Sequence, residues 1–414
     1  MRLFLTTTLL LGAALSSFAV TADGKHKIVL IAGKPSHPPR MHEFNAGVQL
    51  LAGCLKNVKD LDVKYVLNGW PQDESIFEGA DAIVFYMDGG TKHEVLQDGG
   101  KRLAKVDEWV KKGLSIGCLH YGVTVDPPEN GGEQFKRWIG GHYEEKFSCN
   151  PLWEPNFVQF PEHPITRGVK PFQIKDEWYF NIRFTDGFSA DAIVEKDGVK
   201  FTPILVAKPS DAVRNGPYVF PAGPYPHIQA MKGRQEAMMW ALERPDGGRG
   251  LGFTGGHFHD NWGNDEFRKI VLNGLVWLAK LDVPAEGVAS TVTKDQIELN
   301  LDPKPQKKKA DAAPAPANPA PAKAGAVNKN TPPKLGAVQP AAGGAQPPQQ
   351  QPPQPPAGPG AIIIFNNGNQ PRNVVTPTTP TRFAVRGVGA SLEADATIID
   401  AKKKKDEKKD EAKK

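Results

Sequence analysis

The stretch Lys27-Ile28-Val29-Leu30-Ile31-Ala32-Gly33 decides the fold class of this chain. After Lys27 it is a continuous apolar run that ends in glycine, the pattern of a strand buried on both faces of a parallel sheet. Comparable runs return at 63–67, 82–86 and 114–119, and a late one at 249–254. The sequence therefore predicts a set of buried strands spread along the first 280 residues.

Helical patterns separate these strands. Apolar residues recur at helical spacing in 44–55, 103–110 and 267–278. Strands separated by helices require right-handed crossovers, so we predict an α/β fold with a doubly wound parallel sheet. Residues 123–235 are rich in Pro, Gly and aromatic residues and are interpreted as an elaborated insertion with short strands at 157–160 and 203–207.

Both ends of the chain differ from its middle. Residues 3–19 are almost wholly apolar or hydroxylic and lead to small residues at 20–22, which is typical of a cleavable secretory signal. From about residue 302 the composition shifts to Ala, Pro, Gln and Lys, which buries too little apolar surface to fold. We therefore predict a signal peptide at 1–22, an α/β domain at 24–290 and a disordered tail at 291–414, in a protein exported to the periplasm or the extracellular space.

Two features of the predicted tail leave alternatives open. The apolar island at 362–365 is either sticky disorder or a short β-forming docking strip. The end at 402–414 has a net charge of +4 and is either a solvated terminus or a contact for anionic polymers of the cell envelope.

The net charge of +5 is distributed unevenly. Residues 301–414 hold 18 Lys or Arg and nine Asp or Glu, a net charge of +9, which leaves −4 for residues 1–300. Binding to phosphates needs a basic excess, so we expect no nucleic-acid partner for the domain. No later apolar run has the length of a transmembrane segment.

The cysteine spacing does not indicate a disulfide scaffold. Cys54, Cys118 and Cys149 show no repeated Cys-x-x-Cys spacing, and an odd number leaves one thiol over. We expect thiols in an ordinary core, with no disulfide at Cys54 or Cys118.

Histidines gather directly after the predicted strands. Ligands of open α/β sheets bind beyond the carboxyl ends of the strands, and five of the ten histidines follow such ends, beside glycines that leave backbone N–H groups bare. Imidazole titrates near neutral pH and suits acid–base work. We predict catalytic roles for His120, His257 and Glu177, and ligand binding by His37, His42, Glu43, Asp88, Tyr121, His142, Tyr179 and His259, with His37, His120 and His257 in one cleft that His142 and Glu177 cover.

An ordered set of short motifs resembles a known family. It comprises Gly33 with Ser36-His37, His42-Glu43-Phe44-Asn45-Ala46-Gly47, Leu119-His120-Tyr121, His163-Pro164-Ile165-Thr166, Asp176-Glu177-Trp178-Tyr179, Gly248-Arg249-Gly250 and Gly255-Gly256-His257. Over residues 25–282 the chain is similar to the ThuA-like (trehalose utilisation) domain family. The resemblance implies a flavodoxin-like fold related to class I glutamine amidotransferases, and catabolism of trehalose-type or keto-sugars. His259 and the Pro-rich tail depart from the family pattern.

Several functions remain open from the sequence. The first is a sugar-processing enzyme using acid–base chemistry on a small carbohydrate; the second is a non-catalytic carbohydrate-binding module on a flexible tether. The third is a thiol hydrolase using Cys118, although that residue lies inside an apolar run, where a thiol is ordinarily structural. No cofactor is identified. A divalent metal stays open, because His257-x-His259, His37 or His42, Glu43 and Asp88 offer ligands that zinc or manganese prefer.

Overall fold

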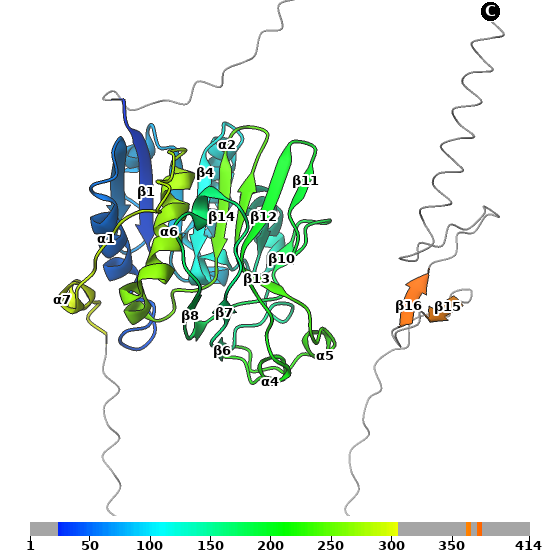
Figure 1. The fold of residues 1–414 in the computed structure, drawn as a ribbon. Helices are drawn as coiled ribbons and strands as arrows, with labels where there is room; N and C mark the ends of the chain where they lie inside the picture. Colours follow the sequence, from blue (N-terminus) through cyan, green and yellow to red (C-terminus); the bar gives the residue numbers. More distant parts are fainter. Residues whose placement is uncertain (1–23, 305–361, 366–370, 375–414) are drawn as a thin grey trace, which may run out of the picture. The chain divides into compact units, whose positions relative to one another are not determined.

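The computed structural model describes residues 24–304 and two short segments, 362–365 and 371–374 (Figure 1). The predicted signal peptide at 1–22 lies outside the described residues. In the second unit of the chain, β15 (Ile362–Phe365) pairs antiparallel with β16 (Pro371–Val374), so the apolar island does form a strand. The rest of the predicted tail beyond 304, including 402–414, also lies outside the described residues.

The domain is built on one eight-stranded sheet. Its order is β11-β12-β13-β14-β4-β3-β1-β2. The strands are β1 (His26–Ala32), β2 (Leu61–Val66), β3 (Ala82–Tyr86), β4 (Ser115–Leu119), β11 (Val194–Lys196), β12 (Val199–Ala207), β13 (Glu236–Glu243) and β14 (Arg249–Phe253). The run from β2 to β14 is parallel, whereas β14, β13, β12 and β11 pair antiparallel.

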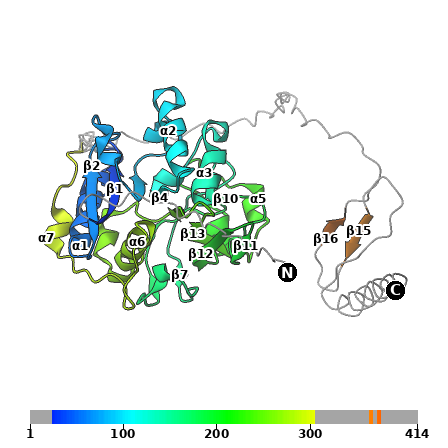
Figure 2. The ribbon, with the colours of Figure 1, turned by 90° about the horizontal axis from the view of Figure 1, so that it is seen from above.

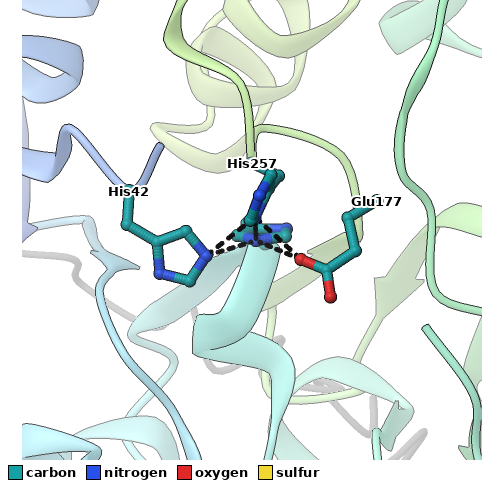
Figure 3. Close-up of side chains that lie close together, drawn as sticks. His42, Glu177 and His257 are labelled. Carbon is teal, nitrogen blue, oxygen red and sulfur yellow. Dashed lines mark hydrogen bonds and ion pairs between the residues drawn. The ribbon is translucent and has the colours of Figure 1, made fainter. Parts of the chain in front are cut away.

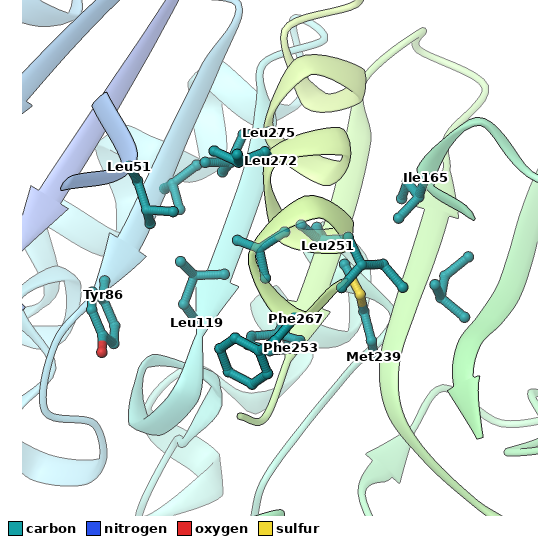
Figure 4. Close-up of a cluster of buried hydrophobic side chains, with 14 of the residues drawn as sticks. Leu51, Tyr86, Leu119, Ile165, Met239, Leu251, Phe253, Phe267, Leu272 and Leu275 are labelled. Carbon is teal, nitrogen blue, oxygen red and sulfur yellow. The ribbon is translucent and has the colours of Figure 1, made fainter. Parts of the chain in front are cut away.

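Helices cover both faces of the sheet (Figure 2). On one face lie α1 (Phe44–Leu55) and α6 (Asp265–Leu278), and on the other lie α2 (Lys101–Val110) and α3 (Gly132–Ile139). Side chains of β1 alternate between the two layers: Leu30 packs in the core of the first face and Ile31 in that of the second. Leu51 of α1 and Leu275 of α6 belong to the first core (Figure 4). A strand covered on both sides must be apolar at every position, which explains the unbroken run at 28–32.

The predicted α/β class is confirmed, with one difference in the sheet. The parallel strands have the order β2-β1-β3-β4-β14, which is the order 2-1-3-4-5 of a flavodoxin-like sheet. The antiparallel strand β13 was not predicted, and the predicted strand at 203–207 is the end of β12, which extends the main sheet. The sheet is therefore mixed and not wholly parallel.

The insertion between β4 and β12 consists of small pieces. Its two-stranded sheets pair β5 (Gly141–His142) with β10 (Arg183–Phe184), β6 (Leu152–Trp153) with β9 (Asp176–Glu177), and β7 (Asn156–Phe157) with β8 (Phe172–Gln173). Two short helices, α4 (Asp211–Arg214) and α5 (Pro226–Gln229), follow β12. The predicted strand at 157–160 is thus only the two-residue β7.

The folded chain continues past the predicted boundary at 290. Helix α7 (Lys294–Glu298) begins with a capping box at Thr293 and buries Ile297. Further on, Asp302 N donates to Glu43 Oε2 at 2.9 Å, and Lys304 pairs with the same carboxylate. The segment 291–304 therefore belongs to the domain and not to a disordered tail.

Two predictions, on disulfides and on membrane-spanning segments, can be compared with the described part of the chain. Cys54, Cys118 and Cys149 are free thiols. Within residues 24–304, no helix combines the length and apolar character that crossing a bilayer requires.

Candidate functional site

Four loops at the carboxyl edge of the parallel strands carry the predicted site. The loop after β1 carries His42, and Asp88 follows β3. His120 begins a short 3-10 helix (His120–Val123) directly after β4, and His257 follows β14. Because β1, β3, β4 and β14 run in the same direction, their carboxyl ends bring these residues to one edge.

Three imidazoles and one carboxylate meet there (Figure 3). His42 Nε2 lies 3.0 Å from both His257 Nδ1 and His120 Nε2, and His257 Nδ1 lies 3.3 Å from His120 Nε2. Glu177 Oε2, from β9 of the insertion, lies 2.7 Å from His257 Nδ1 and 3.6 Å from His120 Nε2. We call His42, His120, Glu177 and His257 the four-residue cluster.

Neighbouring groups orient the members of the cluster. His42 Nδ1 lies 3.0 Å from Asp88 Oδ1, and His120 Nδ1 lies 3.0 Å from the carbonyl oxygen of Thr254. A carboxylate and a carbonyl only accept hydrogen bonds, so both Nδ1 atoms carry the proton of a neutral ring and both Nε2 atoms present lone pairs. Asn150 Nδ2 donates to Glu177 Oε1 at 2.7 Å and turns Oε2 toward the histidines.

Burial sets the charge states in the cluster. All four residues are at least 95% buried. Desolvation lowers the pKa of His42 and His120 well below 6.5, and the neighbouring histidines lower it further. Desolvation raises the pKa of Glu177, which the hydrogen bond from His257 partly offsets. Burial therefore favours the neutral form of His42, of His120 and of the Glu177 carboxyl group.

Three of the histidines have an unusual backbone. His37, His42 and His120 have φ values of 63°, 49° and 51°. A residue other than glycine pays a steric cost in this left-handed region, and such conformations persist only where the surroundings enforce them, often at functional sites. Beside them, a Cβ on Gly89 would lie 2.0 Å from the carbonyl oxygen of Tyr121, so only glycine fits at the end of β3.

A cavity of about 360 Å³ opens above the cluster. Its wall contains several aromatic rings and several side-chain oxygen atoms. The residues that line it include His37, His42, Asp88, Lys92, Tyr121, Thr124, Asp126, Tyr143, Glu145, Asn150, Glu177, Tyr179 and Phe220. Of the predicted residues, His37, His42, Asp88, Tyr121, Glu177 and Tyr179 therefore share one cavity, with His120 and His257 buried at its base against His42 and Glu177.

Three predicted ligand-binding residues lie elsewhere. Glu43 points to the C-terminal segment, where it accepts from the backbone of Arg40 and Asp302. His142 Nδ1 contacts the carbonyl oxygen of Tyr143, and the ring lies against the start of α3 at Gly132 rather than over the site. His259 Nε2 contacts the carbonyl oxygen of Ile297. The predicted pairing of His257 with His259 as joint ligands is therefore wrong.

Two residues of the site were missed by sequence reasoning. Asp176 is fully buried, and its carboxylate accepts from the backbone N–H groups of Gly256 and His257 at 2.7 and 3.0 Å. Asp176 thereby fixes the loop that carries His257, while Asn150 holds Glu177. Asp176 stands beside Glu177 in a quoted motif, which was the available signal, whereas Asn150 had none.

Cys118 has the environment of a structural thiol. It lies within β4, is completely buried, and packs in the core on the face that α2 and α3 cover. Burial raises the pKa of the Cys118 thiol far above its usual value, so the thiolate needed for nucleophilic attack is disfavoured. The geometry does not support the thiol-hydrolase hypothesis.

Comparison with known proteins identifies one family and finds similar solved structures. The model of the ThuA family, described as trehalose utilisation, matches residues 29–278. No curated protein matches the chain. Two solved structures that it resembles are described as putative ThuA-like proteins. The one from Parabacteroides merdae is 15% identical, with a TM-score of 0.42, and the match covers 66% of this chain and 99% of the other. The one from Bacteroides uniformis is 14% identical, with a TM-score of 0.42, and the match covers 63% and 95%.

Proposed function

This chain belongs to the ThuA (trehalose utilisation) family, and from that premise we propose that it is an enzyme acting on a small uncharged carbohydrate, of the trehalose or keto-sugar type. The observation that carries the proposal is the four-residue cluster at the base of a cavity. Titratable groups that converge on a concave, partly aromatic space are the usual composition of an active site.

The charge of the cavity favours an uncharged sugar over a phosphorylated one. Asp88, Asp126, Glu145 and Glu177 line it, against the single ammonium of Lys92. Carboxylates repel phosphate but accept hydrogen bonds from sugar hydroxyls. The tyrosine and phenylalanine rings of the wall offer apolar faces to the C–H side of a sugar ring.

Two hydroxyl groups in the wall have unused hydrogen-bonding capacity. Thr124 Oγ1 and Tyr143 Oη are buried and have no hydrogen-bond partner among the described residues. Both residues line the cavity. A buried hydroxyl without a partner is costly, and a bound polyol would satisfy it.

The chemistry assigned to the cluster follows from its charge states. His120 and His257 act as acid–base or polarising groups toward a sugar oxygen, and Glu177 is their carboxylate partner. A neutral imidazole can accept a proton or a hydrogen bond, and a carboxyl group of raised pKa can donate one.

The test is turnover by the full chain. Trehalose and its keto derivative are incubated with the protein, and products are followed by NMR. We expect His120→Gln to reduce turnover at least about 100-fold, the usual loss when an acid–base or polarising group is removed. His259→Gln is the matched control, because it changes a buried histidine outside the cavity and keeps an N–H donor for Ile297.

A carbohydrate-binding module is the alternative outcome. It would bind the sugar without converting it, and His120→Gln would change only the affinity. That result would contradict the catalytic proposal and leave the cavity assignment intact.

We also propose export for this protein, on the strength of the apolar start at 3–19. Expression of the full chain with N-terminal sequencing of the mature product tests it. Cleavage near residue 22 is expected, and an intact N-terminus in the cytoplasm would contradict it. We also propose that the basic end at 402–414 contacts the cell envelope. Deletion of these residues should then release the protein from the envelope.

A further inference from the structure

We propose that the four-residue cluster is a binding site for one divalent first-row transition-metal ion, held by His42 Nε2, His120 Nε2, His257 Nδ1 and Glu177 Oε2. These four atoms all lie within 4.8 Å of one another. The inference uses the same site as the proposed function, but metal binding is measured without any sugar.

The spacing of the ligand atoms fits coordination. Bonds of about 2.0–2.1 Å from zinc to nitrogen in a tetrahedron put neighbouring nitrogens about 3.4 Å apart. The three nitrogens lie 3.0, 3.0 and 3.3 Å apart, and the carboxylate oxygen lies 2.7 and 3.6 Å from two of them. A single ion among these atoms would lie close to bonding distance from the three nitrogens, and the carboxylate oxygen lies within 4.8 Å of each of them.

Hydrogen bonding among the residues accounts for only part of the arrangement. The Nδ1 protons of His42 and His120 are committed to Asp88 and to the carbonyl of Thr254. The two Nε2 atoms therefore face each other at 3.0 Å as two acceptors. The possible donors near them are His257 Nδ1, which is shared with Glu177, and Tyr179 Oη, which lies 3.3 Å from His120 Nε2. No hydrogen bond can form directly between two acceptors, whereas one metal ion would accept the lone pairs of all four atoms at once.

The outer contacts are those of metal-binding histidines. A ligating imidazole usually donates its other N–H to a carboxylate or a backbone carbonyl, which fixes the ring and its tautomer. His42 has the carboxylate and His120 has the carbonyl. Asn150 orients Glu177, and Asp176 holds the backbone of His257. This support is independent of the spacing of the ligand atoms.

The donor set indicates the class of metal. Three imidazole nitrogens and one carboxylate oxygen suit zinc, manganese, cobalt or iron(II), whereas calcium and magnesium prefer oxygen alone. The thiol of Cys118 takes no part. A bound ion also selects between the two roles proposed for the imidazoles: ligation occupies their lone pairs, so they polarise a sugar oxygen through the ion and do not carry protons. This last point rests on the proposed function.

The experiment measures metal, not activity. The full chain is purified with a histidine-free tag, stripped with a chelator and titrated with Co²⁺ and Zn²⁺. We expect one ion per chain with a dissociation constant below about 1 µM, and visible Co²⁺ bands without the thiolate charge-transfer band of a cysteine ligand. Inductively coupled plasma mass spectrometry of unstripped protein gives the resident metal.

Variants decide whether the ion occupies this cluster. His257→Gln and Glu177→Gln should lower the affinity at least 10-fold, whereas His259→Gln and His142→Gln should leave it unchanged. His259 stands two residues from His257 and His142 is equally buried, so these controls separate ligation from general damage, with a thermal melt to show folding. The inference would be overturned if the stripped, unsubstituted protein bound no stoichiometric metal, or if His257→Gln bound the metal equally well. Undiminished sugar turnover by the stripped protein would overturn the polarising role of the ion and leave the proposed function standing.

Discussion

Lys304 Nζ lies 3.1 Å from Glu43 Oε1, and both side chains are almost completely buried. The ammonium also donates to the carbonyl oxygen of Met41. Glu43 directly follows His42 in the chain and caps nothing in α1 by its side chain. The C-terminal segment of the domain is therefore attached to the loop that carries one member of the four-residue cluster.

Truncation should reveal this attachment. A chain ending at 304 should melt like the full chain, whereas a chain ending at 290 loses the buried Glu43–Lys304 ion pair and the buried side chain of Ile297. Breaking a buried ion pair costs about 3–5 kcal/mol, so the melting temperature should fall on the order of 10 °C. Differential scanning calorimetry measures both, and equal melting temperatures would show that 291–304 contributes nothing to the fold.

Asp176 should act as a positioning residue for His257. In Asp176→Asn, one of the two acceptor oxygens becomes an amide donor that faces the N–H of Gly256 or His257. An unsatisfied buried pair costs about 1–3 kcal/mol, so urea denaturation should show that loss together with weaker Co²⁺ binding. Asp126→Asn, in the cavity wall, is the control for a neutralised carboxylate. Unchanged stability and metal affinity in Asp176→Asn would refute the role.

His163 should make the fold sensitive to acid. Burial, with Lys200 and Arg249 nearby, lowers the pKa of His163 to about 4, and Nδ1 accepts from the backbone N–H of Ile165 at 3.2 Å. The unfolded chain takes up this proton at about pH 6.5 and the folded chain only near 4. The contribution of neutral His163 to the free energy of unfolding is therefore fully present above pH 6.5 and is lost progressively as the pH falls from 6.5 to 4.

His163→Asn tests that sign. Asparagine keeps an acceptor for Ile165 N–H but does not titrate. Urea denaturation between pH 7.5 and 4.5 should show a shallower fall in the free energy of unfolding, by up to about 1.4 kcal/mol per pH unit. An unchanged slope would mean that His163 binds its proton equally in both states.

Thiol labelling should separate the cysteines. Cys118 and Cys149 are fully buried and Cys54 is partly exposed. Iodoacetamide should label Cys54 slowly in the native protein and the other two only after unfolding, with no bridged peptides in unreduced digests. Rapid native labelling of Cys118 would revive the thiol hypothesis.

Sequence alone predicted the elements that have strong patterns. The run at 28–32 must be apolar throughout because both faces of β1 are covered, so its burial was readable. Strand β13, at 236–243, could not be predicted in this way. Its apolar centre Ala-Met-Met-Trp-Ala-Leu lacks β-branched residues and suits a helix equally well. The mixed character of the sheet depends on that one strand.

The site was predictable to the extent that topology determines it. His42, His120 and His257 follow parallel strands, and a common strand direction was enough to bring them together. His142 and His259 were misplaced because loop geometry decides where their rings point. The ring of His259 turns to the carbonyl of Ile297, a contact from α7, which had been assigned to the tail. Asp176 was missed because an anchor of backbone N–H groups has no spacing rule.

The anchorage of Lys304 has a mechanical meaning. The last described residue before the gap, Lys304, contacts the domain at Glu43, one residue from His42. If the far end of the chain is held by a surface, tension along it is applied first to the loop of His42. Such a force would act on the Glu43–Lys304 ion pair before it acts on the sheet. Because Glu43 adjoins His42, the four-residue cluster is the part of the fold that the force would disturb first.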